Sequence, residues 1–321
     1  MLKDIIRNNL GNCLTDSSFL DLPNKKVGKV RDIYDLGKIL VLVTTDRQSA
    51  FDRLLANIPF KGQVLNQISN YWFRLTQDIV PNHVINVPDP NIMVAKKCRP
   101  IKVEFVVRGY LTGTTKTSSW MLYKDGGRNL CGNVLPDGMK KNQKFPEPIL
   151  TPTTKGDEHD EAISLEQIVK RGLLDQDSLH RAQRIVMRLF EFGQVVADQH
   201  GLILVDTKYE LGFDEKGRLT LIDEIHTPDS SRYWLKNSYE ELFAMGMEPE
   251  NIDKEFLRLW FAGHCDPYKD KVLPQAPEDL VIELSRRYIQ LFEMITGEEF
   301  AVDPRPIEQR IVENMRGHLP R

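Results

Sequence analysis

Three charged side chains follow a strongly apolar run in the second half of the chain. Residues 201–213 read GLILVDTKYELGF, so Asp206, Lys208 and Glu210 come directly after four aliphatic residues. In a strand, residues two apart lie on the same face, so these three side chains are expected to share one face of a buried strand. Carboxylates and an ammonium group at the end of a core strand are suited to binding a metal ion or a phosphate.

The charged strand is predicted to form a hairpin with the next apolar run, RLTLIDEI, across the turn sequence DEKG. A regular register places Phe213 opposite Arg218. In that register Lys208 lies opposite Asp223, and Glu210 lies one diagonal step away, which is near enough for long side chains to converge. Two carboxylates together with phosphate oxygens are typical of a Mg²⁺ site, so Glu210 and Asp223 are the predicted metal ligands.

Two other interpretations of the hairpin stay open. A one-residue bulge would turn Asp223 to the other face of the sheet and put Glu224 in its place. The same spacing also occurs in surface hairpins, where Lys208 would form a cross-strand ion pair with Asp223. The apolar residues upstream of the charges, and the place of the charges at strand ends, favour a functional site.

Three other segments carry groups that could bind phosphate. In VVRGYLTGTTKTSSW, Arg108 ends an apolar strand, and hydroxyl side chains then precede a predicted helix. In GKVRDIY, Lys29 and Arg31 alternate along a predicted strand and so point the same way, without a GxGxxG or Walker A motif. In TPDSSRYW, Ser231 and Arg232 offer a hydroxyl and a guanidinium fork. A basic strand face and a solvated loop are the alternatives for the last two segments.

The sequence contains no recognisable nucleophile motif. Neither GxSxG nor HExxH occurs, and the four cysteines are far apart, with no CxxC pair. This spacing disfavours a zinc site and favours free thiols in a reducing cytoplasm. The chemistry is therefore predicted to be electrostatic, with cations and a metal placed around phosphate groups.

The elements that must position these residues indicate a mixed fold, α/β or α+β. Strands are expected at KILVLVTT, HVINV and IKVEFVVRGYL, and helices at the N-terminus and over residues 64–77. Residues 124–161 are rich in Gly and Pro and are expected to form a long loop. Helices are expected before the charged hairpin and through most of the C-terminal region. A strand-rich first half and a mixed second half suggest two lobes.

The composition of the 321 residues is that of a soluble globular protein, with 41% hydrophobic and 28% charged residues. The formal net charge of −3 gives no support for nucleic acid as the main partner. No apolar run approaches the roughly 20 residues needed to span a membrane. The N-terminal segment also lacks the apolar core of a signal peptide. A small anionic substrate fits these limits, because a local basic pocket needs few residues.

Taken together, six segments resemble the SAICAR synthetase family (phosphoribosylaminoimidazole-succinocarboxamide synthases). They are GKVRDIYDLG, LVTTDRQSAFD, IPFKGQVLNQIS, VEFVVRGYLTGT, LILVDTKYELGF and LIDEIHTPDSSRYW, in the family's order and over nearly the whole chain. The resemblance implies a two-lobed fold related to ATP-grasp enzymes and protein kinases, with ATP in the cleft between the lobes. A strand-rich nucleotide-binding lobe would cover residues 1–105. A mixed lobe with the metal and substrate site would cover residues 106–321.

The resemblance also implies a reaction. The family joins L-aspartate to the carboxylate of carboxyaminoimidazole ribonucleotide (CAIR), using ATP and Mg²⁺, and releases SAICAR, ADP and phosphate. A carboxylate is a poor electrophile, and its conversion to an acyl phosphate provides a leaving group for attack by an amine. This route requires in-line phosphoryl transfer, charge neutralisation and the exclusion of water. These small molecules are the expected partners, without nucleic acid or membrane.

By resemblance, each candidate residue takes a role. Lys208 and Asp206 would be the catalytic residues: Lys208 would add positive charge near the phosphate of the ribonucleotide, and Asp206 would orient Lys208 or the substrate. The remaining assignments are ATP binding by Lys29, Arg31 and Glu104, metal binding by Glu210 and Asp223, and substrate binding by Arg108, Thr114, Arg232, Ser49, Asp52, Ser231, Lys155, His159 and Asp160. Within the last group, Arg108, Thr114 and Arg232 would bind the phosphate of the ribonucleotide. The family often has Ser in place of Thr114, and either residue supplies a hydroxyl. The segment TPTTKGDEHD would close over the site.

Two other functions fit the same residues. Another ATP-dependent phosphotransferase, such as a small-molecule kinase, would need the same phosphate and metal groups. A non-catalytic nucleotide-binding module would keep ATP affinity without turnover.

Overall fold

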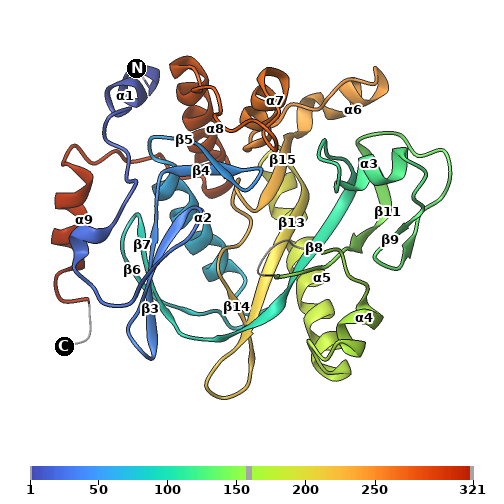
Figure 1. Ribbon diagram of the computed structural model, residues 1–321, viewed down its shortest axis with the longest axis horizontal. Helices are drawn as coiled ribbons and strands as arrows, with labels where there is room; N and C mark the ends of the chain where they lie inside the picture. The colour runs from blue at the N-terminus through green and yellow to red at the C-terminus, as the bar shows by residue number, and fades with distance from the viewer. Residues whose placement is uncertain (1, 157–160, 319–321) are drawn as a thin grey trace.

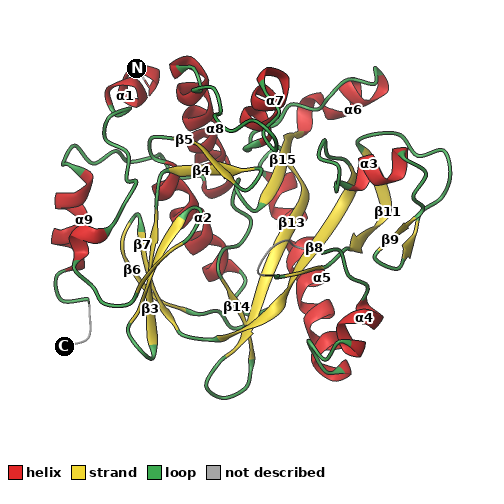
Figure 2. Ribbon diagram, in the orientation of Figure 1, coloured by secondary structure: helices red, strands yellow, loops and turns green. Residues whose placement is uncertain are grey.

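The computed structural model describes residues 2–156 and 161–318 of the chain. Two sheets with antiparallel strand pairing lie side by side, and helices surround them (Figure 1, Figure 2). This arrangement confirms the predicted mixed class and is better described as α+β than as α/β. No helix within the described ranges is long and apolar enough to cross a membrane.

The smaller sheet comes from the first third of the chain. Its five strands have the order β1-β2-β3-β7-β6. Their bounds are Lys25–Val27 (β1), Arg31–Asp35 (β2), Ile39–Thr44 (β3), Ile92–Lys96 (β7) and Val84–Asp89 (β6). The apolar run KILVLVTT forms β3, which pairs with β2 on one side and β7 on the other. Gly28 lies between β1 and β2. A separate hairpin of β4 (Arg47–Ala50) and β5 (Arg53–Asn57) follows β3.

The larger sheet carries the charged strand. Its main order is β11-β8-β13-β14, with β12 paired to β8 and β15 paired to β13. The bounds are Gln143–Leu150 (β11), Arg99–Leu111 (β8), Leu202–Phe213 (β13), Leu219–Ile222 (β14), Thr153–Thr154 (β12) and Ser231–Leu235 (β15). The two longest strands, β8 and β13, are neighbours in its middle (Figure 1). Most of the charged candidate residues of this sheet lie on these two paired strands.

The helices pack against the sheets and against one another. Helix α5 packs on β13 and β8, α2 packs on β3 and α8, and α9 packs on β6. The bounds are Leu2–Asn8 (α1), Lys61–Leu75 (α2), Ser119–Lys124 (α3), Leu165–Lys170 (α4), Gln176–Gln199 (α5), Lys236–Ala244 (α6), Glu255–His264 (α7), Glu278–Thr296 (α8) and Ile307–Met315 (α9). Ser164 and Gln167 form a capping box at the start of α4.

One continuous hydrophobic core connects the two sheets. Its buried members include Leu42 of β3, Phe105 of β8, Tyr209 of β13 and Phe190 of α5. A smaller core lies between the first sheet and α9, around Ile311. The shared core holds the two sheets, and so the charged groups on them, in a fixed relation.

The segment 124–161 is not the uniform loop that its composition suggests. It contains the short strands β9 (Asn129–Leu130) and β10 (Asn133–Val134), together with β11 and β12. β11 includes Pro146 and Pro148, and its pairing with β8 is interrupted between Lys144 and Ile149. Proline is tolerated in an edge strand because one side of that strand needs no donors. Because of the two prolines, the segment lacks the alternating pattern that predicts a strand. β11 is recognised only from its pairing with β8.

The lobe boundary expected after residue 105 falls inside β8, which belongs to the larger sheet along its whole length. The strand pairing favours a division between β7 and β8. The assignment of two functional lobes stays a prediction.

Candidate active site

Lys208 is the centre of a charged cluster on the face that β13 shares with β8. Its Nζ lies 2.6 Å from Oε1 of Glu210, 3.2 Å from Oδ2 of Asp223 and 3.4 Å from Oε1 of Glu104. The pairing of the two strands puts Lys208 opposite Val106 and Glu210 opposite Glu104. Strand alternation therefore directs these charges to one face, as the sequence predicts.

Asp223 reaches this cluster although the predicted hairpin register was wrong. Phe213 lies opposite Leu219 and not opposite Arg218, which is a shift of one residue. In a regular strand this shift would turn Asp223 away from Lys208. However, β14 ends one residue earlier, and Asp223 has a left-handed backbone with φ of 66°. Because Asp223 lies beyond the end of β14, its side chain contacts Lys208 despite the shifted register.

Arg31 joins the two sheets at the cluster. Its NH1 lies 2.6 Å from Oδ1 of Asp223, and its NH2 lies 2.9 Å from Oε2 of Glu224. The same Glu224 oxygen accepts a hydrogen bond of 2.6 Å from the hydroxyl of Thr227. Arg31 begins β2 of the smaller sheet, whereas Asp223 follows β14 of the larger sheet. Arg31 is therefore a partner of both Asp223 and Glu224, the alternative metal ligand, and the choice between the two as metal ligands stays a prediction.

The charges of the cluster alternate in sign. Burial alone would lower the pKa of Lys208, but the carboxylates of Glu210 and Asp223 hold that pKa well above its usual value. Burial also opposes the ionisation of Asp223, and Lys208 and Arg31 overcome it and hold the pKa of that carboxyl far below its usual range. Lys155 extends the series through an ion pair with Glu210. Lys208 and Asp223 therefore stay charged near neutral pH.

The carboxylates of Glu210 and Asp223 fit a divalent cation by their chemistry. Both lie within 3.2 Å of the same ammonium group, and carboxylate oxygens are the ligands that Mg²⁺ prefers. Residues 2–156 and 161–318 contain no group of three or more acidic, histidine or cysteine side chains arranged for a metal. A cation here would therefore need further ligands, which phosphate oxygens and water supply.

The segment expected to close over the site is described in part. Lys155 follows β12, which pairs with β8 through Thr153 opposite Glu104. This pairing anchors the start of the segment beside the cluster. His159 and Asp160, the other two predicted substrate-binding residues of the segment, lie outside the described residues.

A pocket of about 240 Å³ adjoins the cluster and shares Glu104 and Lys208 with it. Five acidic side chains line the pocket. Five basic side chains also line it, namely Arg108, Lys208, Arg232, Lys254 and Arg258. A small cavity with this many paired charges is suited to a highly charged ligand.

Arg108 and Arg232 meet at Asp206 in this pocket. Oδ2 of Asp206 lies 3.0 Å from NH1 of Arg108 and 2.5 Å from NH1 of Arg232. The two arginines come from β8 and β15, the strands on either side of β13. Arg108 also donates from Nε to the hydroxyl of Thr151 at 2.8 Å. The predicted convergence of the two arginines is present, and the ion pairs of Asp206 are with them and not with Lys208.

Thr114 lies beside this arginine pair and bonds to a carboxylate that the sequence did not suggest. Its hydroxyl donates to Oε1 of Glu255 at 2.5 Å, and NH1 of Arg258 donates to Oε2 at 3.0 Å. A Cβ on Gly113 would lie 3.4 Å from NH2 of Arg232, so the backbone before Thr114 approaches that guanidinium closely. Glu255 and Arg258 both belong to α7.

The other predicted residues differ in how closely they approach the pocket. Ser231 lines it and donates to the hydroxyl of Thr207 at 2.7 Å. Ser49 lies on β4, and Asp52 lies in the β4–β5 turn, where it pairs with Lys29 at 2.5 Å. Lys29 precedes β2 and is exposed, whereas Arg31 is buried, so their predicted common direction is wrong.

Sequence reasoning missed two groups of charged side chains near the pocket. One is Glu255 and Arg258 of α7, whose spacing of three residues is the same as that of ordinary ion pairs on helix surfaces. The other is Lys61, which is fully buried, has no hydrogen-bond partner among the described residues and lies 3.7 Å from Oδ2 of Asp229. Lys61 lies in IPFKGQVLNQIS, one of the six segments that resemble the family. The sequence therefore pointed to this segment but gave no role to Lys61.

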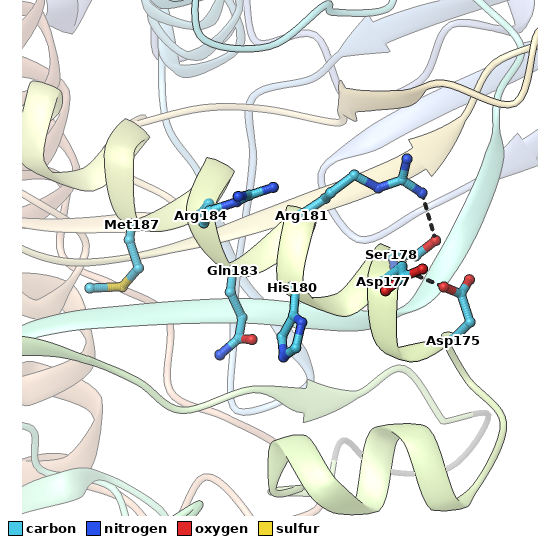
Figure 3. A pocket seen from close by; sticks show the side chains of 8 residues that line it. All are labelled: Asp175, Asp177, Ser178, His180, Arg181, Gln183, Arg184 and Met187. Atoms are coloured by element: carbon cyan, nitrogen blue, oxygen red, sulfur yellow. Dashed lines mark hydrogen bonds between the residues drawn. The ribbon is translucent and has the colours of Figure 1, made fainter.

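A larger groove of about 890 Å³ runs along the start of α5 and shares no residue with the charged pocket (Figure 3). Two side-chain contacts are drawn there. Asp175 accepts a hydrogen bond of 2.8 Å from the backbone N–H of Ser178, and Arg181 donates to the hydroxyl of Ser178 at 3.1 Å. The first of these is the cap of the helix, so the groove gives no indication of catalysis.

Comparison with known proteins agrees with the resemblance read from the motifs. The SAICAR synthetase family matches residues 24–275. A phosphoribosylaminoimidazole-succinocarboxamide synthase of Legionella pneumophila (strain Lens) is 60% identical over 309 residues, which are 96% of this chain and 99% of that protein. A solved SAICAR synthase from Saccharomyces cerevisiae, complexed with SAICAR, is 33% identical with a TM-score of 0.76, over 88% of this chain and 97% of that one. A solved SAICAR synthetase in complex with ADP is 25% identical with a TM-score of 0.66, over 87% of this chain and 100% of that one. This chain therefore belongs to the SAICAR synthetase family.

Proposed function

We infer that this chain is an ATP-dependent carbon–nitrogen ligase, which joins L-aspartate to the carboxylate of CAIR and forms SAICAR, ADP and phosphate. The observation that carries this proposal is the adjacency of two sites. The charged cluster around Lys208 suits phosphate groups and a metal, and the pocket with Arg108 and Arg232 suits an anionic substrate. The sites share Lys208 and Glu104. The relatives named as SAICAR synthases support the reaction.

ATP would bind where Arg31 joins the smaller sheet to the larger one. Lys29 is exposed and could exchange Asp52 for a phosphate. Glu210 and Asp223 would hold Mg²⁺, which when bound neutralises phosphate charge. The ADP complex of a relative supports the use of ATP.

The chemistry assigns Lys208 to the transferring phosphoryl group. A CAIR carboxylate oxygen attacks the γ-phosphorus of ATP, and a new P–O bond forms as the bond to ADP breaks. An ammonium beside the phosphoryl oxygens stabilises the charge that develops there. The amine of aspartate then attacks the acyl carbon, the C–N bond forms, and phosphate departs as the nitrogen loses a proton.

The pocket would hold the ribonucleotide. A phosphate group suits the two guanidiniums of Arg108 and Arg232, because each offers a fork of N–H donors. Thr114 and Ser231 would add hydroxyl donors at its edge. Lys155, His159 and Asp160, together with Ser49 and Asp52, are proposed to surround the remaining substrate space.

One assay separates this proposal from the alternatives. Purified protein is mixed with ATP, Mg²⁺ and CAIR, with and without L-aspartate, and products are identified by mass spectrometry. A ligase forms SAICAR only when aspartate is present. Stable phosphorylated CAIR without amide would identify a kinase instead.

A non-catalytic nucleotide-binding module predicts a different result. Such a module would bind ATP without turnover, and its ATP affinity would survive Glu210→Ala and Asp223→Ala. For the ligase, both substitutions abolish turnover.

The cellular setting belongs to the same proposal. All four cysteines are free thiols, which agrees with the reducing cytoplasm where we place the enzyme. The nucleotide-binding part would be the smaller sheet, and the substrate part the larger sheet with its helices.

A further inference from the structure

Arg258 is a pocket residue with an unused donor. It lies on α7 (Figure 1). NH1 of Arg258 donates to Glu255, while its Nε–H is buried and has no hydrogen-bond partner among the described residues. Buried guanidinium N–H groups normally have a partner, so an unpaired one beside a cavity suggests a missing ligand. The face of Phe51, 5.3 Å from the guanidinium carbon, helps to fix its position.

Glu255 marks where an anion fits. One of its oxygens accepts a hydrogen bond from the hydroxyl of Thr114, and the other accepts one from Arg258. A hydroxyl and a guanidinium are also the donors that bind phosphate oxygens in proteins. The carboxylate therefore occupies donors that a phosphate would use.

The two arginines already assigned to the phosphate do not balance its charge. Arg108 and Arg232 share the carboxylate of Asp206, which leaves one net positive charge. A phosphate monoester carries about −1.5 to −2 at neutral pH. Arg258 is the third arginine in the lining of the same pocket. Glu255 pairs with Arg258 at 3.0 Å and cancels its charge.

We propose that Arg258 is a third phosphate-binding arginine for the ribonucleotide, and that Glu255 holds Arg258 and Thr114 in place until the phosphate takes over these donors. This inference rests on the proposed function, because it names the ribonucleotide as the ligand. It makes α7 part of the substrate site. It also assigns opposite effects to two neighbouring residues, since Arg258 attracts the phosphate and Glu255 repels it.

The ordinary interpretation of this pair is a helix-surface ion pair, and α8 contains such a pair for comparison. Arg286 contacts Glu283 at 2.7 Å with the same three-residue spacing, but neither residue lines the pocket. Arg286→Ala is therefore the matched control for Arg258→Ala.

The test is the KM for each of the three substrates in four variants. Arg258→Ala should raise the KM for CAIR by about ten- to a hundredfold, the usual effect of losing a hydrogen bond to a charged group, and leave the KM for ATP and aspartate within about twofold. Arg258→Lys should lie between the parent and Arg258→Ala, because it keeps the charge without the fork. Glu255→Gln should lower the KM for CAIR, and Arg286→Ala should match the parent.

Three results would overturn the inference. They are an unchanged KM for CAIR in Arg258→Ala, an equal rise for all three substrates, and a rise confined to aspartate. If Arg258→Ala does not fold, Arg258→Lys and Glu255→Gln decide, because a merely structural pair predicts no decrease of KM in Glu255→Gln. A parent protein that makes no SAICAR refutes the proposed function itself, whereas this inference is tested by the KM pattern of an active parent.

Discussion

Replacing Lys208 by methionine should destabilise the protein and make its stability depend on Mg²⁺. Methionine keeps much of the length of the side chain but removes the ammonium, which contacts Glu210 at 2.6 Å, Asp223 at 3.2 Å and Glu104 at 3.4 Å. Removing one partner of a buried ion pair costs about 3–5 kcal/mol. Lys208 is 27% exposed, so we expect the lower end, about 3 kcal/mol. At about 2–4 °C per kcal/mol, the Tm should fall by about 6–12 °C.

Mg²⁺ should restore most of the stability that Lys208→Met loses. Three carboxylates without their shared ammonium attract a divalent cation more strongly than the parent cluster does. A cation at a hundred times its Kd stabilises the folded state by about 2.7 kcal/mol. Adding Mg²⁺ should therefore raise the Tm of Lys208→Met clearly more than that of the parent, and Glu210→Gln in the same chain should remove the difference.

Differential scanning calorimetry with a Mg²⁺ titration measures both effects. Lys97→Met is the control, because Lys97 pairs with Asp35 at 2.6 Å on the exposed surface and should cost no more than about 1 kcal/mol. The reasoning fails if Lys208→Met melts like the parent. It also fails if Mg²⁺ raises the Tm of the parent and of Lys208→Met by the same amount.

Four further outcomes follow from the structure. Arg232→Ala should raise the KM for CAIR far more than that for ATP in steady-state kinetics, and equal effects would contradict its assignment. Burial lowers the pKa of His226 to about 3, so its contribution to stability is present above its unfolded pKa of about 6.5 and is lost as the pH falls. Between pH 7.5 and pH 5 that loss should reach about 2 kcal/mol in denaturant titrations, and His226→Gln should show a correspondingly shallower decline. Gly62→Ala should destabilise by more than about 3 kcal/mol or prevent folding, because its Cβ would lie 2.2 Å from the carbonyl oxygen of Thr44. Gly263→Ala, with nothing within 4 Å of its Cβ, should instead stabilise by about 0.5–1 kcal/mol in thermal melts.

The features that depend on local periodicity were predicted well. Alternation along β13 correctly placed Lys208 and Glu210 on one face, because side-chain direction in a strand is a property of the strand itself. The helices of the second half were also recognised, because the helical period is likewise a property of the local backbone. By contrast β11 was missed, because an edge strand with two prolines has no period and exists only through its pairing with β8.

The hairpin shows how a local prediction can be wrong in one step and still place a residue correctly. The register depends on turn geometry, which four residues of sequence do not fix, and it was wrong by one. The contact between Asp223 and Lys208 survived because β14 ends before Asp223 and the backbone turns there. The sequence pattern contained no signal for that turn.

By itself, then, the sequence determined which strand face carries the charges, the order of the family's motifs, and a chemistry of cations and carboxylates around phosphate. Only the tertiary structure decided the partners of those charges. Arg31 meets Asp223 from 192 positions away, and α7 brings Arg258 to a pocket whose other arginines lie on β8 and β15. Strand and helix periods are set by the local backbone, whereas these contacts depend on how two sheets and a distant helix pack around one shared core.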